Sequence, residues 1–169
     1  MSDQRIEVVP YRSEWVDLFE QERSSLALAL ALYPHQIEHI GSTSVPGLHA
    51  KPIIDIAVLL DDLSCVDQLI EPLAALGYEY QGEYGLPGRR FFTRGKPRVF
   101  HLHLVDGRTD HWQRWLTFRE ILRRNEEIRG DYERLKQELA QRFSSDRAGY
   151  TASKSDFIND IVERELGLP

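Results

Sequence analysis

The apolar positions in the N-terminal third of the chain change from helical to strand-like spacing. Ser13 is a suitable N-cap, and the apolar residues that follow it at helical spacing predict one helix that ends at Tyr33-Pro34. Short apolar segments at residues 36–40 and 52–60 then predict two strands, separated by a loop of small residues. The pattern therefore indicates a helix followed by paired strands.

The middle of the chain adds a helix and a meander of strands. A helix is predicted over about residues 64–76, because its apolar residues share one side and Gly77 provides a stop. Pro72 is expected to kink or divide this helix. From residue 78 to residue 107 the residues alternate and are interrupted by Gly-Leu-Pro-Gly and Gly-Lys-Pro, which predicts two or three antiparallel strands joined by hairpin turns.

The last third of the chain has the spacing of helices. Thr109 or Asp110 is expected to cap the first of them, and Gly130 is expected to interrupt the helical run. A final helix is predicted from about Ser153. No repeat or long linker separates these elements, so the pattern predicts one domain over residues 1–169.

Composition narrows the class of protein. The 169 residues are 41% apolar with a net charge of −6, so the chain can bury a core, and binding of nucleic acid is disfavoured without being excluded. A single cysteine, Cys65, excludes an internal disulfide and fits a reducing compartment. The N-terminus lacks a signal-peptide pattern, and no apolar run approaches the roughly 20 residues of a membrane span. We therefore expect a cytoplasmic protein that does not enter a membrane.

The loop GSTSVPG is the first candidate for a functional role. Gly41, Ser42, Thr43 and Ser44 combine small residues, which let backbone amides approach an anion, with three hydroxyl donors, and Lys51 adds positive charge. Such a segment can hold a phosphate group. Composition alone favours a simple turn instead, and the Gly-Lys-Ser/Thr ending of a Walker loop is missing.

Asp55 is the second candidate, because it is the one charged residue of an apolar strand. Alternation along the strand places Asp55 and Ala57 on one face, and on the other face it places Ile54, Ile56, Val58 and Leu60. A buried carboxylate is costly unless it is paired, hydrogen-bonded or bound to a cation. A metal or substrate role is as well supported as a salt bridge to one of the arginines of the meander, namely Arg89, Arg90, Arg94 and Arg98.

The segment VFHLHLVD supplies the third candidate. His101 and His103 share one face of a predicted strand, about 7 Å apart, and two imidazoles on one face suit a metal ion or a phosphoryl group. Two half-buried histidines on a polar face are the simpler interpretation of this pattern alone. If both converge with Asp55, they form a two-histidine, one-carboxylate metal site, to which His39 can add a fourth group.

Basic residues of the meander point to an anionic ligand. Arg90 and Arg98, with Arg89 beside them, place guanidinium groups near the two histidines, where they can hold phosphate oxygens. Ordinary pairing with the acidic excess explains each of them equally well. These residues would therefore suit an anionic ligand such as a phosphate group.

The segment HIGSTSVPGLHAKPIIDI resembles the signature of the GrpB family. The similarity continues through YRSEW, RVFHLHL, W..WL.FRE.LR and the C-terminal Y...K..FI, which contains Tyr150 and Lys154. GrpB proteins are grouped by resemblance with the nucleotidyltransferase superfamily. This resemblance implies an α/β (α+β) fold with a mixed, mostly antiparallel sheet packed by helices.

The superfamily pattern is matched only in part. It implies a Gly-Ser after the first strand and two carboxylates, two positions apart on the next strand, which hold divalent metals on the nucleotide phosphates. The Gly-Ser and Asp55 match, whereas Ala57 stands at the second carboxylate, and the strand expected to carry a third has His101 and His103. A divalent metal (Mg²⁺, Mn²⁺ or Zn²⁺) is the implied cofactor, although magnesium prefers oxygen ligands. No organic cofactor is indicated.

Three functions follow from these candidates. The first is a divergent nucleotidyl- or phosphoryl-transfer enzyme, in which Asp55, His101 and His103 bind a metal or transfer protons while the loop and the basic residues bind phosphates. The second is a module that binds a nucleotide or another phosphorylated small molecule without turnover. The third is a metal-dependent hydrolase that uses the same carboxylate and histidines. We rank the divergent transferase first.

Overall fold

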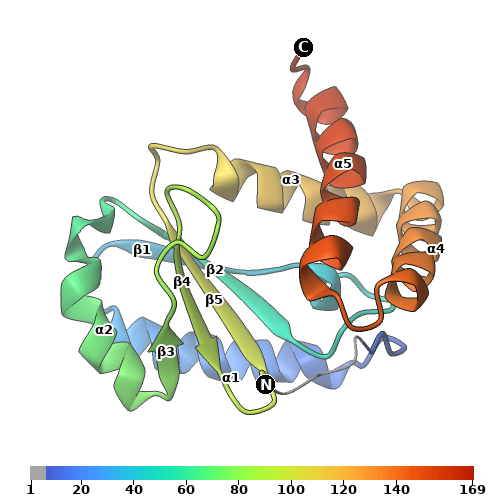
Figure 1. Cartoon of the computed structure of the whole chain (residues 1–169). Helices are drawn as coiled ribbons and strands as arrows, with labels where there is room; N and C mark the ends of the chain where they lie inside the picture. Colours follow the sequence, from blue (N-terminus) through green and yellow to red (C-terminus); the bar gives the residue numbers. More distant parts are fainter. Residues whose placement is uncertain (1–6) are drawn as a thin grey trace.

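The computed structural model describes residues 7–169 as helices packed around one sheet (Figure 1). The first elements are α1 (Glu14–Ala29), β1 (His35–Ile40), the 3₁₀ turn η1 (Ser42–Ser44) and β2 (Ile54–Leu60). The next are η2 (Leu63–Cys65), α2 (Val66–Ala75), β3 (Tyr78–Tyr80), β4 (Arg90–Arg94) and β5 (Phe100–Val105). The last are α3 (His111–Arg124), α4 (Glu126–Arg142) and α5 (Arg147–Leu166).

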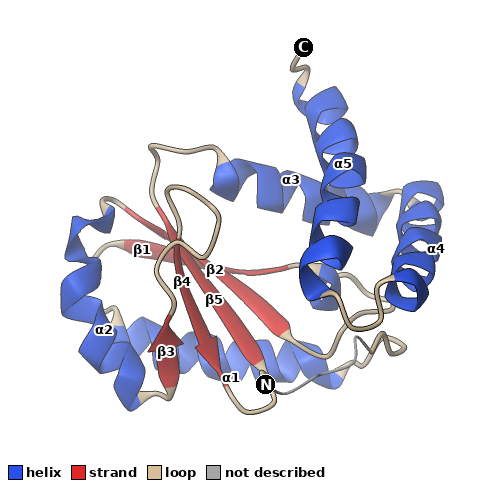
Figure 2. Ribbon diagram, viewed as in Figure 1, coloured by secondary structure: helices blue, strands red, loops and turns tan. Residues whose placement is uncertain are grey.

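The strands lie in the order β1-β2-β5-β4-β3 (Figure 2). Neighbouring strands are antiparallel except for β2 and β5, which are parallel because the chain between them crosses through α2, β3 and β4. The fold is therefore α/β with a mixed, mostly antiparallel sheet, and β3, β4 and β5 form the expected meander.

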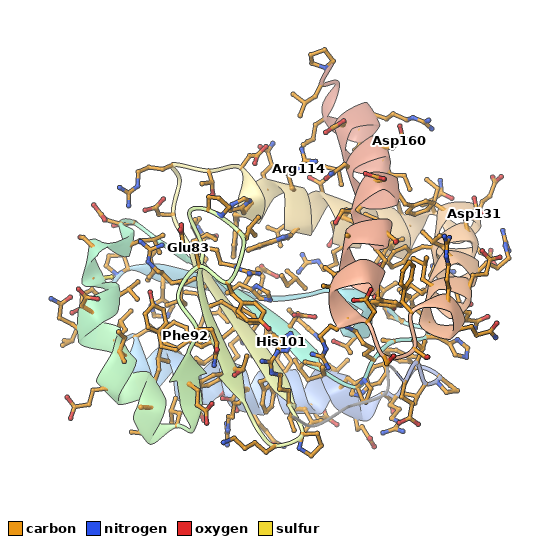
Figure 3. The ribbon with its side chains drawn as sticks, viewed as in Figure 1. Glu83, Phe92, His101, Arg114, Asp131 and Asp160 are labelled. Carbon is orange, nitrogen blue, oxygen red and sulfur yellow. The ribbon has the colours of Figure 1, made fainter. Side chains whose placement is uncertain are left out.

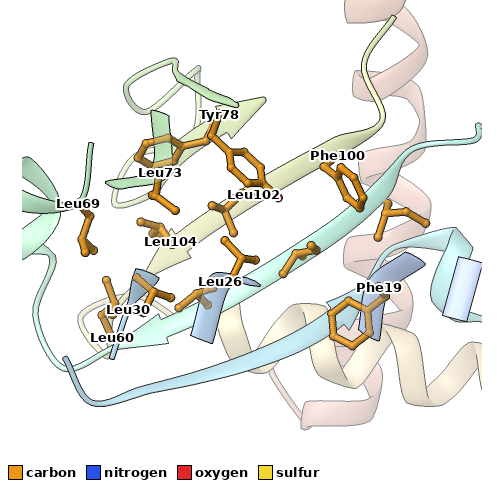
Figure 4. Packing of buried hydrophobic residues seen from close by; sticks show 14 of the residues in the cluster. Phe19, Leu26, Leu30, Leu60, Leu69, Leu73, Tyr78, Phe100, Leu102 and Leu104 are labelled. Carbon is orange, nitrogen blue, oxygen red and sulfur yellow. The ribbon is translucent and has the colours of Figure 1, made fainter. Parts of the chain in front are cut away.

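One face of the sheet carries the main core, beneath α1 and α2 (Figure 4). The four apolar residues that alternation along β2 assigns to one face are all at most 2% exposed there. They pack with Phe100, Leu102 and Leu104 of β5 and with Leu26 and Leu30 of α1. Complete burial of each such side chain contributes about 1.5–3 kcal/mol to folding. The opposite face, which carries Asp55, is thus left for other contacts.

The C-terminal helices attach to the segment that follows η1. Val45 and Leu48 are fully buried against Leu122 of α3 and Tyr132 of α4. Figure 1 shows α4 and α5 at the opposite end of the molecule from α2. The helices therefore hold the loop of small residues between themselves and the sheet.

Several helix features differ from the sequence expectations, and the first helix ends at Ala29 rather than at Tyr33-Pro34. Pro72 does not divide α2; it lies on the exposed side, where water can bond the carbonyl that loses its donor. Gly130 lies inside α4, and the break comes at Asn125, whose side chain accepts a hydrogen bond from the Ile128 amide at 3.0 Å. A cap at Asn125 ends the preceding helix more effectively than one glycine, which costs only about 1 kcal/mol inside a helix.

The final helix begins earlier than expected. Asp146 caps it by accepting a hydrogen bond from the Gly149 amide at 2.9 Å, so α5 starts at Arg147 rather than near Ser153. The extra turns bring Tyr150 into the helix. In residues 7–169, no helix is long and apolar enough to cross a membrane.

Candidate functional site

The three central candidates lie together on the sheet face opposite α1 and α2. β2 and β5 are adjacent and parallel, and their register aligns Asp55 with His101 and Ala57 with His103. Figure 3 shows His101 on the central strands, on the side toward the C-terminal helices. The convergence that the sequence required for a shared site is therefore present.

Asp55 is paired with histidines, so the interpretation of it as an arginine partner is wrong. Its Oδ1 lies 2.9 Å from Nε2 of His103 and 3.5 Å from Nδ1 of His101. Burial opposes ionisation, but the bonds to His101 and His103 outweigh it and hold the pKa of Asp55 well below its usual range. The side chain keeps 29% exposure, so a ligand can still reach this carboxylate.

Gly41 is required where η1 meets Asp55. Its φ of 73° is a left-handed conformation, and a Cβ at this position would stand 2.7 Å from Oδ2 of Asp55. The loop backbone can therefore approach the carboxylate only because this residue has no side chain.

The contacts of His103 with its two neighbours fix the tautomer of its imidazole ring. Its Nδ1 lies 3.3 Å from Nη1 of Arg89, and a guanidinium only donates, so Nδ1 accepts and Nε2–H donates to Asp55. Burial lowers the pKa of His103 in spite of the bond to Asp55. Both ring nitrogens of His103 are thus occupied within the protein.

His101 differs from His103 because one of its nitrogens is unused. Nδ1 faces Asp55, whereas Nε2 is buried and has no hydrogen-bond partner among the described residues. Its ring packs edge-on against Phe91 of β4, with ring centroids 5.1 Å apart. A buried imidazole nitrogen without a partner is costly, and a ligand or an ordered water would satisfy it.

The loop of small residues offers fewer hydroxyl groups than its sequence indicates. The Ser44 hydroxyl donates to the Gly41 carbonyl, and the Thr43 hydroxyl bonds Nε2 of His39 at 2.8 Å. Both residues are buried, so their hydroxyls hold the loop itself. Arg123 of α3 fixes the turn further, because its guanidinium donates twice to the Ser44 carbonyl. Ser42 is half-buried and is the least enclosed residue of the three.

His39 is not part of the site, contrary to the expectation of a fourth group. The register pairs it with Ile56, whose side chain lies in the core on the opposite face. Its ring stacks on Phe19 of α1, with centroids 4.7 Å apart, and burial lowers the pKa of His39 to about 4. It is a neutral core histidine that positions Thr43.

Three lysines from three segments gather beside the loop, and we call them the lysine cluster: Lys51, Lys136 and Lys154. The ammonium groups of Lys51 and Lys154 lie over the ring of Tyr150, at 4.9 and 4.5 Å from its centroid. Lys136 is 2% exposed, donates to the His49 carbonyl and lies over the ring of Tyr132. Sequence reasoning missed Lys136 and gave Lys154 no role.

The charged forms of the lysines in the lysine cluster are disfavoured by burial and by repulsion between them. Burial lowers the pKa of Lys136 and of Lys154 to about 7, and mutual repulsion within the cluster adds to this effect. Burial and the nearby Arg147 also lower the pKa of Lys51, while Asp55 raises it. Within the described residues, no carboxylate forms a salt bridge with any of the three. The region attracts anions strongly.

The candidate arginines divide between the two faces. Arg90 is aligned with Leu104 on the core face and pairs with Glu83 at 3.5 Å, so it does not reach the site. Its neighbour Arg89 does, through His103 and through the ring of Phe91 at 4.5 Å. Arg98 extends over the ring of Tyr84 at 5.8 Å and adds to the positive potential at Lys51.

The residues present do not fit the magnesium site of the superfamily pattern. Ala57 gives no oxygen, and the carboxylate opposite it in the register, Glu38, is held by Arg119 at 2.7 Å. Both ring nitrogens of His103 already have hydrogen-bond partners, Asp55 and Arg89. Within residues 7–169, no group of three or more His, Cys, Asp or Glu side chains is arranged to hold a metal ion. Asp55 is thus a single carboxylate in contact with imidazoles.

The fold resembles that of nucleotidyltransferases. A crystal structure of the Cid1 poly(U) polymerase bound to MgATP matches 79% of this chain and 45% of its own, with a TM-score of 0.57. Its sequence identity is 14%, so the likeness concerns the fold alone.

The chain belongs to the GrpB family, whose pattern matches residues 5–164 under the description GrpB protein. A crystal structure of GrpB from Enterococcus faecalis is 40% identical, with a TM-score of 0.88 over 95% of this chain and 98% of that one. A UPF0157 protein of Pseudomonas aeruginosa is 39% identical over 97% of this chain and 69% of its own length.

One relative with a longer chain carries the name of a kinase. The dephospho-CoA kinase of Mycolicibacterium paratuberculosis is 28% identical over 185 aligned residues. The similar region spans 94% of this chain and 46% of that protein. The GrpB-like region is thus about half of that relative.

Proposed function

We propose that the chain binds a nucleotide or another phosphorylated small molecule, with its phosphates on the lysine cluster beside Asp55. The observation that carries the proposal is the convergence of Lys51, Lys136 and Lys154 in a partly desolvated place, where no carboxylate of residues 7–169 forms a salt bridge with them. Holding like charges together there costs stability, and a phosphate group offsets that cost.

The rest of the site supports the same class of ligand. Ser42 and the Gly41 backbone lie at the turn before β2, where small residues let a phosphate approach. Arg98 adds positive charge on the side of Lys51. Cid1 was solved with MgATP, and the longer relative is named as a kinase of a coenzyme precursor, so both names involve phosphorylated ligands.

Binding of polyphosphates should depend on Lys51 and not on an exposed lysine. We expect Lys51→Met to weaken the affinity for ATP and for inorganic tripolyphosphate at least tenfold, about 1.4 kcal/mol, because it removes an ammonium from the cluster. Lys96, whose side chain is 86% exposed, provides the matched control, Lys96→Met. Isothermal titration calorimetry gives both affinities. Equal affinities in the two variants, or no binding by the wild type, would contradict the proposal.

Nucleotidyl or phosphoryl transfer is a second candidate, favoured by His101. A general base needs a free nitrogen toward the acceptor hydroxyl and a carboxylate behind its other nitrogen. His101 has both, since Nδ1 faces Asp55 and Nε2 has no partner among the described residues. Burial and the neighbouring Arg89 lower the pKa of His103 beside it, while Asp55 raises it. A transfer assay with wild type and His101→Gln would distinguish this activity from binding alone.

The metal-dependent hydrolase is the least supported of the three functions. It requires Asp55, His101 and His103 to share one ion, but His103 already uses Nε2 for Asp55 and Nδ1 for Arg89. Metal binding there would first have to break both contacts. The available nitrogen of His101 is better suited to proton transfer.

A further inference from the structure

The carboxylate side of this site offers a metal one carboxylate, where the superfamily pattern has at least two. Oδ1 of Asp55 contacts both imidazoles, and Oδ2 lies against Gly41. The next position on that face of β2 is Ala57, and the neighbouring Glu38 is bound to Arg119. Magnesium bound to phosphates takes its remaining ligands from carboxylates and waters, and Asp55 is the one carboxylate that the described residues offer it here.

The opposite side of the same site contains an excess of cations. Lys51 and Lys154 share the Tyr150 ring, and both lower the pKa of Lys136. Arg147 and Arg98 add charge around Lys51. Asp55 is the acidic group that acts on Lys51 and Lys154, and Glu133 acts on Lys136. When the lysines are protonated, the local balance is therefore positive before any ligand enters.

These two features together determine which form of a phosphorylated ligand fits. A polyphosphate without metal brings several negative charges, which the ammonium groups neutralise directly. The magnesium complex of the same ligand brings less negative charge and places a divalent cation beside the lysines, where repulsion is weakly screened. The metal would also lack the protein carboxylates that hold it in the superfamily pattern.

We propose that the site selects the metal-free form of its polyphosphate ligand, with the lysine cluster in the electrostatic role that divalent metals have in the superfamily. The proposal rests on the proposed function, since it concerns the same ligand in the same site. It names the ligand class more narrowly, as a polyanion that is not complexed with a divalent cation. Magnesium then acts as a competitor that removes ligand, and not as a cofactor.

Calorimetric titration of ATP and of tripolyphosphate, in EDTA and in excess magnesium, tests this selection. We expect the wild type to bind each probe at least tenfold more tightly in EDTA. Lys154→Met should bring the two affinities closer together, because it removes part of the repulsion toward the metal, whereas Lys96→Met should keep the wild-type ratio.

The outcomes separate this inference from the proposed function. Equal or tighter binding in magnesium would overturn metal-free selection and leave phosphate binding intact. Binding in neither buffer would contradict the proposed function itself. A ratio above ten that Lys154→Met leaves unchanged would also overturn the inference, because magnesium would then act only on the free ligand and not through the cluster.

Discussion

Lys154→Met is expected to make the ligand-free protein more stable and, at the same time, to weaken polyphosphate binding at least tenfold. In the folded chain the Lys154 ammonium stands near Lys51 over the Tyr150 ring, and burial lowers its pKa to about 7. Methionine has similar length and flexibility and packs well against an aromatic ring. The variant therefore removes repulsion without leaving a cavity.

The gain in the free energy of unfolding should be about 1–3 kcal/mol, as for other buried charges replaced by apolar side chains. In a domain of this size each kcal/mol raises Tm by roughly 2–4 °C. Differential scanning calorimetry measures the change, with Lys96→Met as control. Loss of stability together with unchanged binding would mean that Lys154 is a structural residue, and would contradict its assignment to the ligand.

The same lysine gives a pH dependence with a defined sign. The unfolded pKa is near 10.4 and the folded pKa is about 7, so between these values the unfolded chain binds more protons. The destabilisation caused by the Lys154 charge is therefore complete below pH 7. It decreases as the pH rises from about 7 toward 10, so the free energy of unfolding increases over that interval. The stability difference between Lys154→Met and wild type should shrink over that interval.

Unlike Lys154→Met, Asp55→Asn is expected to lower the free energy of unfolding and also to disturb the geometry of the binding site. The carboxylate bonds His103 and His101 and is the acidic group that acts on Lys51 and Lys154. Asparagine still accepts a hydrogen bond from His103 but removes the charge. Because hydrogen bonds to charged groups contribute about 1.5–3 kcal/mol, we expect a loss of about 2 kcal/mol.

Urea denaturation at neutral and at acidic pH checks this expectation. The folded pKa of Asp55 is depressed, so its contribution is complete above its unfolded pKa, near 4, and is lost as the pH falls below that value. The difference between wild type and Asp55→Asn should therefore be largest near neutral pH and decrease in acid. A difference that does not depend on pH would show that ionisation of Asp55 is irrelevant to stability.

Strand periodicity predicted much of this site, because side chains alternate strictly between faces. Side chains along β2 and β5 alternate with a period of two residues. Because the two strands are adjacent, this alternation places Asp55 on the same face as His101 and His103. The same rule, applied after the register is known, explains why His39 and Arg90 lie on the core face. Register between strands distant in the chain is a tertiary property and could not be predicted from these segments alone.

Lys136 shows what helical pattern reasoning misses. It lies four residues after Tyr132 and three before Leu139, on the buried side of α4, so its spacing marked it as core-facing. Its charge made a solvated position the natural interpretation, since lysine is seldom fully buried. Thr43 and Ser44 were misjudged for the reverse reason, because composition reveals hydroxyl groups but not whether the loop uses them internally.

The number of protons taken up when a polyphosphate binds tests the central claim most directly. At about pH 8, Lys136 and Lys154 are mostly neutral, because their pKa values are about 7, and an anion placed between them must raise both. Titration of tripolyphosphate at that pH, in two buffers of different ionisation enthalpy, should reveal net proton uptake that diminishes in Lys154→Met. Binding without proton uptake, or uptake unchanged in the variant, would show that the phosphates do not lie on the lysine cluster.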